Sequence, residues 1–351
     1  MKTFKRKLVL CLPFLGMAWF SLAACPFSLE MPPPSPLTVS TFAGNPPCND
    51  DPDSQQSGQH LGGFADGPGH TAQFNKPTGI AIDKAGNLYV TDSGNFRIRK
   101  ITPEGEVSTF AGDGAEAQFE SLNGIAIDAE GNLYVADASI RKITPEGVVS
   151  TFADIAAKDI TIDSVGNLYV TVSHRIRKIS PEREVTDVAG NNWFGLNNDS
   201  GDAALFDNPR GIALGTNGNL YVADVGNKRI RKVTLGGVVS TFAGKATFPW
   251  DDRLDGVGTE ARFVSLGQIT MGADGNFYLT DGDHIRKATM KAEVTTVAGS
   301  ARTGSGCGAS YRDGLAYQAI FNSPGGMAAA PNGDIYVADT NNHRIRKLTW
   351  E

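Results

Sequence analysis

The chain has 351 residues, of which 40% are hydrophobic and 41 are glycine, and its formal net charge is −6. This size and glycine content fit one large all-β domain with many turns and require no second domain. The acidic balance disfavours binding to nucleic acid, because contacts with the phosphate backbone need a basic surface.

The first segment is typical of a protein destined for export. Four cations lie within the first seven residues, and residues 8–22 are apolar apart from Ser21, as in a secretory signal peptide. The apolar run is too short to span a bilayer, which disfavours a transmembrane anchor. Removal of residues 1–24 would take away four cations and no acid, leaving a net charge of about −10.

The end of this segment, Leu22-Ala23-Ala24-Cys25, resembles a bacterial lipobox, in which the cysteine thiol receives diacylglycerol. We therefore expect a lipoprotein signal peptide over residues 1–24 and lipidation at Cys25; the alternative is a plain signal peptide with an incidental cysteine. Two positions after Cys25 the sequence has Phe27 and not Asp, which resembles the sorting signal of lipoproteins sent to the outer membrane. The expected location is the bacterial cell envelope, with the exported chain lipid-anchored at the outer membrane or cell surface. Residues 25–36 are proline-rich and predict an extended tether.

A repeated unit occupies the rest of the chain, and residues 77–112 show it most clearly. Four runs of five to seven residues, rich in β-branched and aromatic types, are separated by turns containing Gly, Asn, Asp or Pro. This pattern predicts a meander of four short antiparallel strands. Six copies are recognised by the tyrosine of the second strand: Tyr89, Tyr134, Tyr169, Tyr221, Tyr278 and Tyr336.

The two ends of the repeat array complement each other. The sixth copy has no fourth strand, whereas residues 37–44 read as a fourth strand with no strands before them. A ring in which this N-terminal strand completes the last sheet leaves no unpaired edge. The sequence therefore predicts a six-bladed β-propeller of four-stranded antiparallel blades, closed by strand 37–44 joining the last blade.

These residues resemble the NHL-repeat family of propellers, whose repeats combine a Pro-x-Gly-Ile-Ala start, a Gly-Asn-Leu-Tyr-Val-Ala-Asp hairpin and an Asn-x-Arg-Ile-x-Lys strand. The resemblance covers residues 37–351. Blade three departs from it, with Thr171-Val172-Ser173 where other blades place Asp.

Two cysteines other than Cys11 and Cys25 remain. Cys48 and Cys307 lie in the connections that enter blades one and six, which a ring makes neighbours. In an oxidising envelope we expect them to form a disulfide; two free thiols are the alternative.

The third strand of every copy carries an Arg-Lys pair, which could suggest a ring of anion-binding cations. A residue repeated in every blade is better explained by a structural need, and we expect each arginine to pair with the Asp that ends a second strand. The arginines are Arg99, Arg141, Arg177, Arg231, Arg286 and Arg346.

A second recurrent motif is Asp-Gly with Phe eight residues after the Asp, at Asp66, Asp255 and Asp313. We expect the Phe to plug the loop. These aspartates could bind Ca²⁺, but the run of alternating Asp and Asn found in calcium loops is missing. His174, His284 and His343 lack the spacing of metal ligands, and no catalytic motif is found, so neither catalytic nor metal residues are assigned.

The long connections between blades carry the remaining candidates. Aromatic rings among small polar residues suit contacts with glycans, peptides or proteins, although they could equally pin the loops to the blades. The candidates for a binding face are Trp193, Phe194, Trp250, Tyr311 and Tyr317.

Together these observations favour a lipid-anchored extracytoplasmic module that binds or scaffolds through its long-loop face or channel mouth, and we expect a monomer. The ligand would be a protein, peptide or glycan, and no cofactor is expected. One alternative is an enzyme, because similar propellers include lactonases and lyases with a divalent metal in the channel. Another is a structural envelope protein whose loops contact a membrane complex.

Overall fold

The computed structural model describes residues 37–46, 60–112, 119–245, 253–301 and 311–350. The chain divides into two compact units, residues 1–34 and 35–351, and every described residue belongs to the second. The expected signal peptide and tether thus lie outside the described residues. None of the helices in the described ranges is long and apolar enough to cross a membrane.

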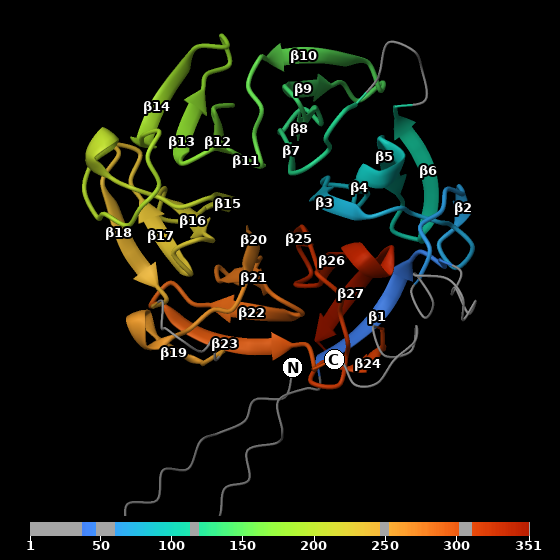
Figure 1. Ribbon diagram of the computed structural model, residues 1–351. Coiled ribbons are helices and arrows are strands. Elements are labelled where there is room, and N and C mark those ends of the chain that lie inside the picture. Colours follow the sequence, from blue (N-terminus) through green and yellow to red (C-terminus); the bar gives the residue numbers. More distant parts are fainter. Residues whose placement is uncertain (1–36, 47–59, 113–118, 246–252, 302–310, 351) are drawn as a thin grey trace, which may run out of the picture. The chain divides into compact units, whose positions relative to one another are not determined.

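Six antiparallel sheets form the blades of a propeller around a central axis (Figure 1). This confirms the predicted fold class. Blade one consists of β3 (Pro77–Ile82), β4 (Leu88–Asp92), β5 (Arg97–Ile101) and β6 (Glu106–Ala111), and blade two of β7 (Ile125–Ile127), β8 (Leu133–Ala136), β9 (Ile140–Ile143) and β10 (Val149–Ala153). Blade three consists of β11 (Asp159–Ile162), β12 (Leu168–Val172), β13 (Arg175–Ile179) and β14 (Val185–Gly190), and blade four of β15 (Pro209–Leu214), β16 (Leu220–Asp224), β17 (Arg229–Val233) and β18 (Val239–Ala243). Blade five consists of β20 (Leu266–Met271), β21 (Phe277–Asp281), β22 (His284–Ala288) and β23 (Glu293–Ala298), and blade six of β25 (Met327–Ala329), β26 (Ile335–Asp339), β27 (Arg344–Trp350) and β1 (Leu37–Ala43).

The turns inside a blade are tight because their residues suit them. In the β3–β4 turn, the Asp83 carboxylate accepts hydrogen bonds from the backbone N–H groups of Ala85 (2.9 Å) and Asn87 (2.8 Å). Gly86 in the same turn has φ +88°, a conformation that glycine adopts without a steric penalty. Short strands and such turns make each blade a compact local unit.

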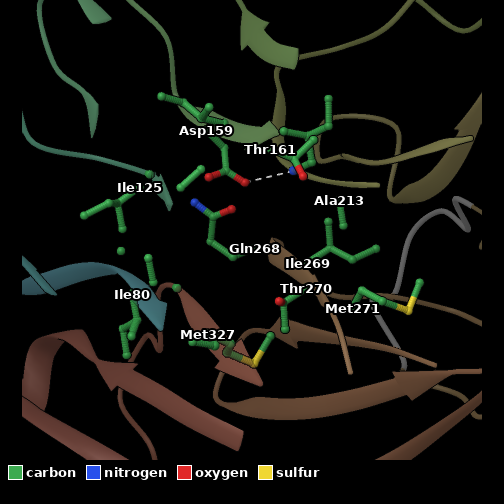
Figure 2. Close-up of a pocket in the computed structure, with 18 of the residues that line it drawn as sticks. Ile80, Ile125, Asp159, Thr161, Ala213, Gln268, Ile269, Thr270, Met271 and Met327 are labelled. Atoms are coloured by element: carbon green, nitrogen blue, oxygen red, sulfur yellow. Dashed lines mark hydrogen bonds between the residues drawn. The ribbon is translucent and has the colours of Figure 1, made fainter. Parts of the chain in front are cut away.

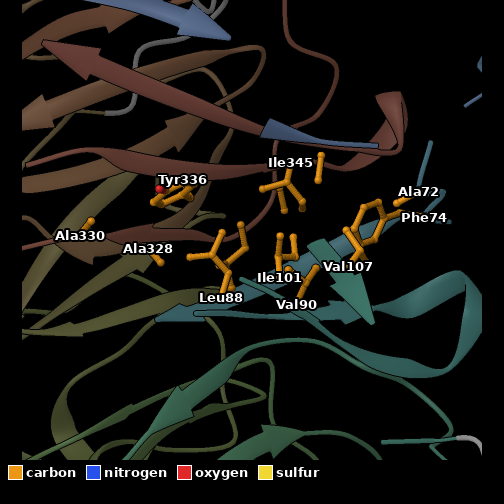
Figure 3. Close-up of a cluster of buried hydrophobic side chains, with 13 residues drawn as sticks. Ala72, Phe74, Leu88, Val90, Ile101, Val107, Ala328, Ala330, Tyr336 and Ile345 are labelled. Atoms are coloured by element: carbon orange, nitrogen blue, oxygen red, sulfur yellow. The ribbon is translucent and has the colours of Figure 1, made fainter. Parts of the chain in front are cut away.

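The ring is closed by pairing of the first and last strands. β1 lies antiparallel to β27, with Leu37 opposite Trp350 and Val39 opposite Leu348. A buried cluster joins this last blade to blade one, and Figure 3 shows Tyr336 and Ile345 beside Leu88 and Phe74. The predicted closure is therefore confirmed, and the core continues across it.

The connections between blades do more than project as loops. Their Asp-Gly segments form short fifth strands at the outer edges of three blades, namely β2 (Gly67–Pro68), β19 (Gly256–Val257) and β24 (Gly314–Leu315). Short 3₁₀ turns also occur: η2 (Gly201–Ala203) and η3 (Gly258–Glu260) lie in connections between blades, whereas η1 (Ser93–Asn95) and η4 (Thr340–Asn342) join the second and third strands of one blade. In the three blades with a fifth strand, the insertion thus pairs with the outer edge of the blade before it reaches the innermost strand.

A buried arginine holds each of these insertions in place. Arg99 donates to Asp92 at the end of β4 (2.9 Å) and to Asp66 of the Asp-Gly segment (2.5 Å), while its guanidinium lies 5.1 Å from the centre of the Phe74 ring. Arg286 and Arg346 make the same three contacts in blades five and six. The expected structural role of these arginines is confirmed, and the Phe residues are buried plugs as predicted.

Blade three shows what happens when this arrangement is missing. Val172 ends β12 where other blades have Asp, and Arg177 instead pairs with Asp187 (2.6 Å), with the two side chains 29% and 32% exposed. In blade four, by contrast, the Arg231–Asp224 pair (2.8 Å) is fully buried. The same position of the repeat is therefore either a solvated ion pair or a buried one.

We predict that Asp224→Ala lowers the free energy of unfolding by about 3–5 kcal/mol, because it leaves the Arg231 guanidinium buried without its counter-ion. Asp187→Ala, at the solvated pair of blade three, should cost about 1 kcal/mol or less. Chemical denaturation of both variants measures the difference. Equal losses in the two blades would show that burial of the pair is not what matters.

Candidate functional site: the channel and its mouth

The innermost strands of the six blades surround a cavity of about 250 Å³ on the propeller axis (Figure 2). Most side chains in its wall are apolar, since each innermost strand contributes an Ile or Met followed by small or apolar residues. The wall includes Ile80, Ile125, Ile160, Ile212, Ile269 and Met327. Polar side chains in this wall are few, so each of them is informative.

The pairing of first and second strands identifies one equivalent position in every blade, just before that Ile or Met. Ile80 lies opposite Val90, and Ile269 lies opposite Leu279 at the same place in blade five. The six equivalent residues are Gly79, Gly124, Asp159, Gly211, Gln268 and Gly326. Blades three and five thus carry a polar side chain where the other four have glycine.

Glycine at this position lets neighbouring blades approach closely. A Cβ added at Gly211 would lie 2.6 Å from the backbone nitrogen of Ile269, and one added at Gly326 would lie 2.6 Å from the carbonyl oxygen of Thr78. A Cβ at Gly124 would collide with the Asp159 carboxylate. Gly124 therefore makes the room that the Asp159 carboxyl group occupies, while Gly211 and Gly326 let the backbones of neighbouring blades pack closely.

Asp159 is a buried carboxyl group without an ionic partner. It is 7% exposed, and its Oδ2 accepts a hydrogen bond from the backbone N–H of Ile212 in the next blade (2.9 Å). None of the described residues forms an ion pair with it. Burial raises its pKa from 3.8 to about 7, against the opposing effect of backbone hydrogen bonds from Ile212 and Ile160. Asp159 can therefore exist in either protonation state near neutral pH.

Gln268 extends into the same cavity. In Figure 2 its amide and the Asp159 carboxyl group point toward one another across the channel. The Gln268 Oε1 atom is buried and has no hydrogen-bond partner among the described residues. A buried amide oxygen left without a donor costs free energy, so this atom is available to a ligand.

A wider cavity of about 550 Å³ forms the mouth of the channel on the long-loop side. Among the described residues of its lining, Lys158 and Arg210 are the charged ones and none is acidic; Gln268 lines both cavities. Burial and the nearby Arg210 charge lower the pKa of Lys158, whose Nζ donates to Asn208. Hydroxyl and amide groups complete the lining: Thr78, Asn123, Ser265, Thr280, Ser323 and Thr340.

The aromatic candidates are not brought together. Trp193 and Phe194, 75% and 70% exposed, lie between β14 and β15, and Tyr317, 68% exposed, follows the perimeter strand β24. Tyr311 is half-buried, with its ring 3.7 Å from the Arg344 guanidinium carbon and its hydroxyl 2.6 Å from Asp313. Trp250, Cys25, Cys48 and Cys307 lie outside the described residues. Trp193 and Phe194 thus remain exposed candidates on the blade-three to blade-four connection.

The residues considered for metal binding have other partners. Asp66, Asp255 and Asp313 each bind a buried arginine, and His174 and His343 each accept a backbone N–H through Nδ1, from Asn208 and Lys76. The described ranges contain no group of three or more His, Cys, Asp or Glu placed to hold a metal ion. These side chains serve the architecture of the loops.

Asp159 and Gln268 are absent from the candidates of the sequence analysis. Counting glycines at the first-strand starts, one would choose Gly267 for blade five, but the strand pairing shows that Gln268 is the equivalent residue. One signal in the sequence could have identified both residues: when the six repeats are aligned, four have glycine at this position and two have a polar residue.

The family model described as "NHL repeat" matches residues 74–101, 206–233 and 321–348. The chain is 31% identical over 303 residues to the chloroplastic protein SUPPRESSOR OF QUENCHING 1 of Arabidopsis thaliana, and 29% identical over 320 residues to NHL repeat-containing protein 2 of Bos taurus. Each match covers 82% of this chain but only 26% and 41% of those longer proteins. The chain therefore carries NHL repeats within a six-bladed β-propeller.

Solved structures share the fold. An auxiliary nutrient binding protein from Bacteroides thetaiotaomicron aligns with a TM-score of 0.69 and 20% identity, over 90% of this chain and 77% of that one. Virginiamycin B lyase from Staphylococcus aureus with quinupristin aligns with a TM-score of 0.55 and 19% identity, over 80% and 96%. At such identities the likeness shows a common architecture.

We predict that Asp159→Asn changes how stability depends on pH. Because the folded-state pKa is raised, the folded protein retains a proton that the unfolded chain releases above pH 3.8. The stability that protonated Asp159 contributes is complete below pH 3.8, where both states hold the proton, and it is lost as the pH rises through about 7. A shift of this size corresponds to roughly 4 kcal/mol. Thermal unfolding between pH 4 and 8 should show wild type losing stability relative to Asp159→Asn.

The exposed Asp202→Asn is the matched control for loss of one charge. Its stability should run parallel to that of wild type over the same pH range. A parallel profile for Asp159→Asn as well would contradict the assignment of a raised pKa to the channel carboxyl.

Proposed function

We propose that this protein is a lipid-anchored, extracytoplasmic binding module, with its ligand held at the mouth of the channel on the long-loop side. The observation that carries the proposal is the composition of the mouth: Lys158 and Arg210 beside hydroxyl and amide groups, with no acid in the lining. On a chain of net charge −6 this is a local positive site. It suits an anionic, polar ligand such as a carboxylated glycan or a peptide carboxylate.

The chemistry of the channel favours binding over metal-dependent catalysis. A divalent metal needs several oxygen or nitrogen ligands that converge from different blades. The channel lining offers one carboxyl group, Asp159, and one amide, Gln268, but no histidine. A lactonase-like or lyase-like metal site therefore lacks the necessary donors among these lining residues.

One of the similar solved structures has a binding role. A propeller of the same architecture is named an auxiliary nutrient binding protein, and we extend that role to this chain only as part of the proposal. Trp193 and Phe194 would add apolar contacts for a ligand or partner protein large enough to reach beyond the mouth.

Binding at the mouth predicts a loss of affinity when its charge is removed. A thermal-shift screen of carboxylated and phosphorylated oligosaccharides and peptides on the purified full-length chain identifies the compounds that bind. The affinity for these compounds should fall about 10–100-fold in the double variant Lys158→Gln plus Arg210→Gln. This range follows from roughly 1.5–3 kcal/mol for a hydrogen bond to a charged group. Lys291→Gln, an exposed lysine in the β22–β23 turn, is the charge-matched control. Hits insensitive to the double variant would count against the mouth.

Lipid anchoring makes a separate prediction. Cys25→Ser should abolish incorporation of a labelled fatty acid and move the chain from the membrane fraction to the soluble fraction, because a serine hydroxyl cannot form the thioether. Cell fractionation and labelling in a bacterial host measure both effects. Continued membrane association of Cys25→Ser would refute anchoring through this residue.

A further inference from the structure

The mouth cavity and the smaller channel cavity adjoin one another. Consecutive residues of the innermost strands line first one cavity and then the other: Thr78 and Gly79, Asn123 and Gly124, Lys158 and Asp159. Gln268 belongs to both linings. A ligand bound at the mouth can therefore extend one end into the channel.

The two ends of this path have opposite chemical character. The mouth presents cationic donors, Lys158 and Arg210. The channel presents acceptors: the Asp159 carboxyl group and the buried, unpartnered Oε1 of Gln268. An ionised carboxylate offers about four lone-pair sites, and backbone N–H groups of Ile212 and Ile160 leave part of that capacity unused. The channel thus presents acceptor atoms with unused capacity, to which a ligand could donate.

This arrangement is particular to two blades rather than general to the repeat. Asp159 and Gln268 stand at two of the six equivalent positions that are otherwise glycine, and Gly211 of the blade between them packs against the backbone of Gln268 and Ile269. A purely architectural need would recur in every blade, as the buried arginines nearly do. Asp159 does link blades three and four through Ile212, but that link gives no role to Gln268.

We infer that the channel is a second subsite, which takes an N–H donor group through Asp159 and Gln268 while Lys158 and Arg210 hold an anionic group at the mouth. The inference rests on the proposed function and narrows its ligand to a small amphoteric class: amino acids, short peptides, or sugars that carry both an acid and an amine or amide. The channel volume of about 250 Å³ admits the end of such a molecule and not a protein domain.

The charge state of the nitrogen can be read from the pH dependence of binding. Asp159 is the one titratable residue in the channel lining; the charges nearest along the strands that flank it are Lys158 and Arg210 at the mouth. A ligand with an ammonium group is attracted by ionised Asp159, so the affinity of the protein for such a ligand should rise between pH 6 and 8 as Asp159 loses its proton. An N-acetylated ligand gains nothing from that ionisation, and its affinity should not rise.

Calorimetry on the purified full-length chain provides the test by measuring the affinity for two series of ligands. The first series is the straight-chain ω-amino acids from glycine to 6-aminohexanoate, and the second is the unsubstituted carboxylic acids of equal length. The expected result is a preferred chain length at which the amino acid binds about 10-fold or more tightly than its unsubstituted acid. Asp159→Asn and Gln268→Met should each remove most of this preference. Arg210→Gln should weaken both series alike, and Lys291→Gln should weaken neither.

The outcomes separate the two proposals. If unsubstituted acids bind and Arg210→Gln weakens them, but the amino group adds no affinity, the channel subsite is wrong and the binding function at the mouth stands. If the amino acids bind but Asp159→Asn and Gln268→Met leave their preference unchanged, the assignment of these residues is wrong. The inference would also be overturned if Ca²⁺ bound to the protein without competing with any amine. The same holds if neither ligand series bound at millimolar concentration.

Discussion

The architecture depends on a buried charge that is held by two carboxylates. In blades one, five and six, one arginine connects the end of a second strand, a perimeter strand and a phenylalanine ring, so that a single side chain fixes three pieces of backbone. A lysine could not replace it, because only the planar guanidinium offers donors in several fixed directions. With the insertions held in this way, the innermost strands are free to vary at the channel.

Most of the fold follows from local patterns in the sequence. Alternating apolar residues, turn residues and the tyrosine of each second strand define six blades, and the unmatched strand at residues 37–44 requires a ring. The perimeter strands β2, β19 and β24 could not be anticipated, since two-residue strands such as Gly67–Pro68 carry no periodic pattern. Their pairing is decided by the Asp66-type contact with a distant arginine, which is tertiary information.

The candidate site was much less predictable. Asp159 and Gln268 are 109 positions apart and belong to non-adjacent blades, so only the closed ring brings them to one cavity. Gly267 also hides Gln268 in the sequence, because it imitates the glycine of other blades until the strand register is known. The exposed Trp193 and Phe194, by contrast, were identifiable from composition alone, since large aromatic side chains stand out in a loop of small polar residues whatever the fold around them.

Pairing of β1 with β27 also sets the order in which the molecule can be completed during synthesis. Five blades can form from neighbouring segments as they are made, but β1 must remain without its partner until the last strand has been added. The final step therefore joins strands about three hundred residues apart, a pairing of very long sequence separation that forms late. A chain translocated from its amino end would expose this edge longest, so the seam is where assistance from a chaperone would have the greatest effect.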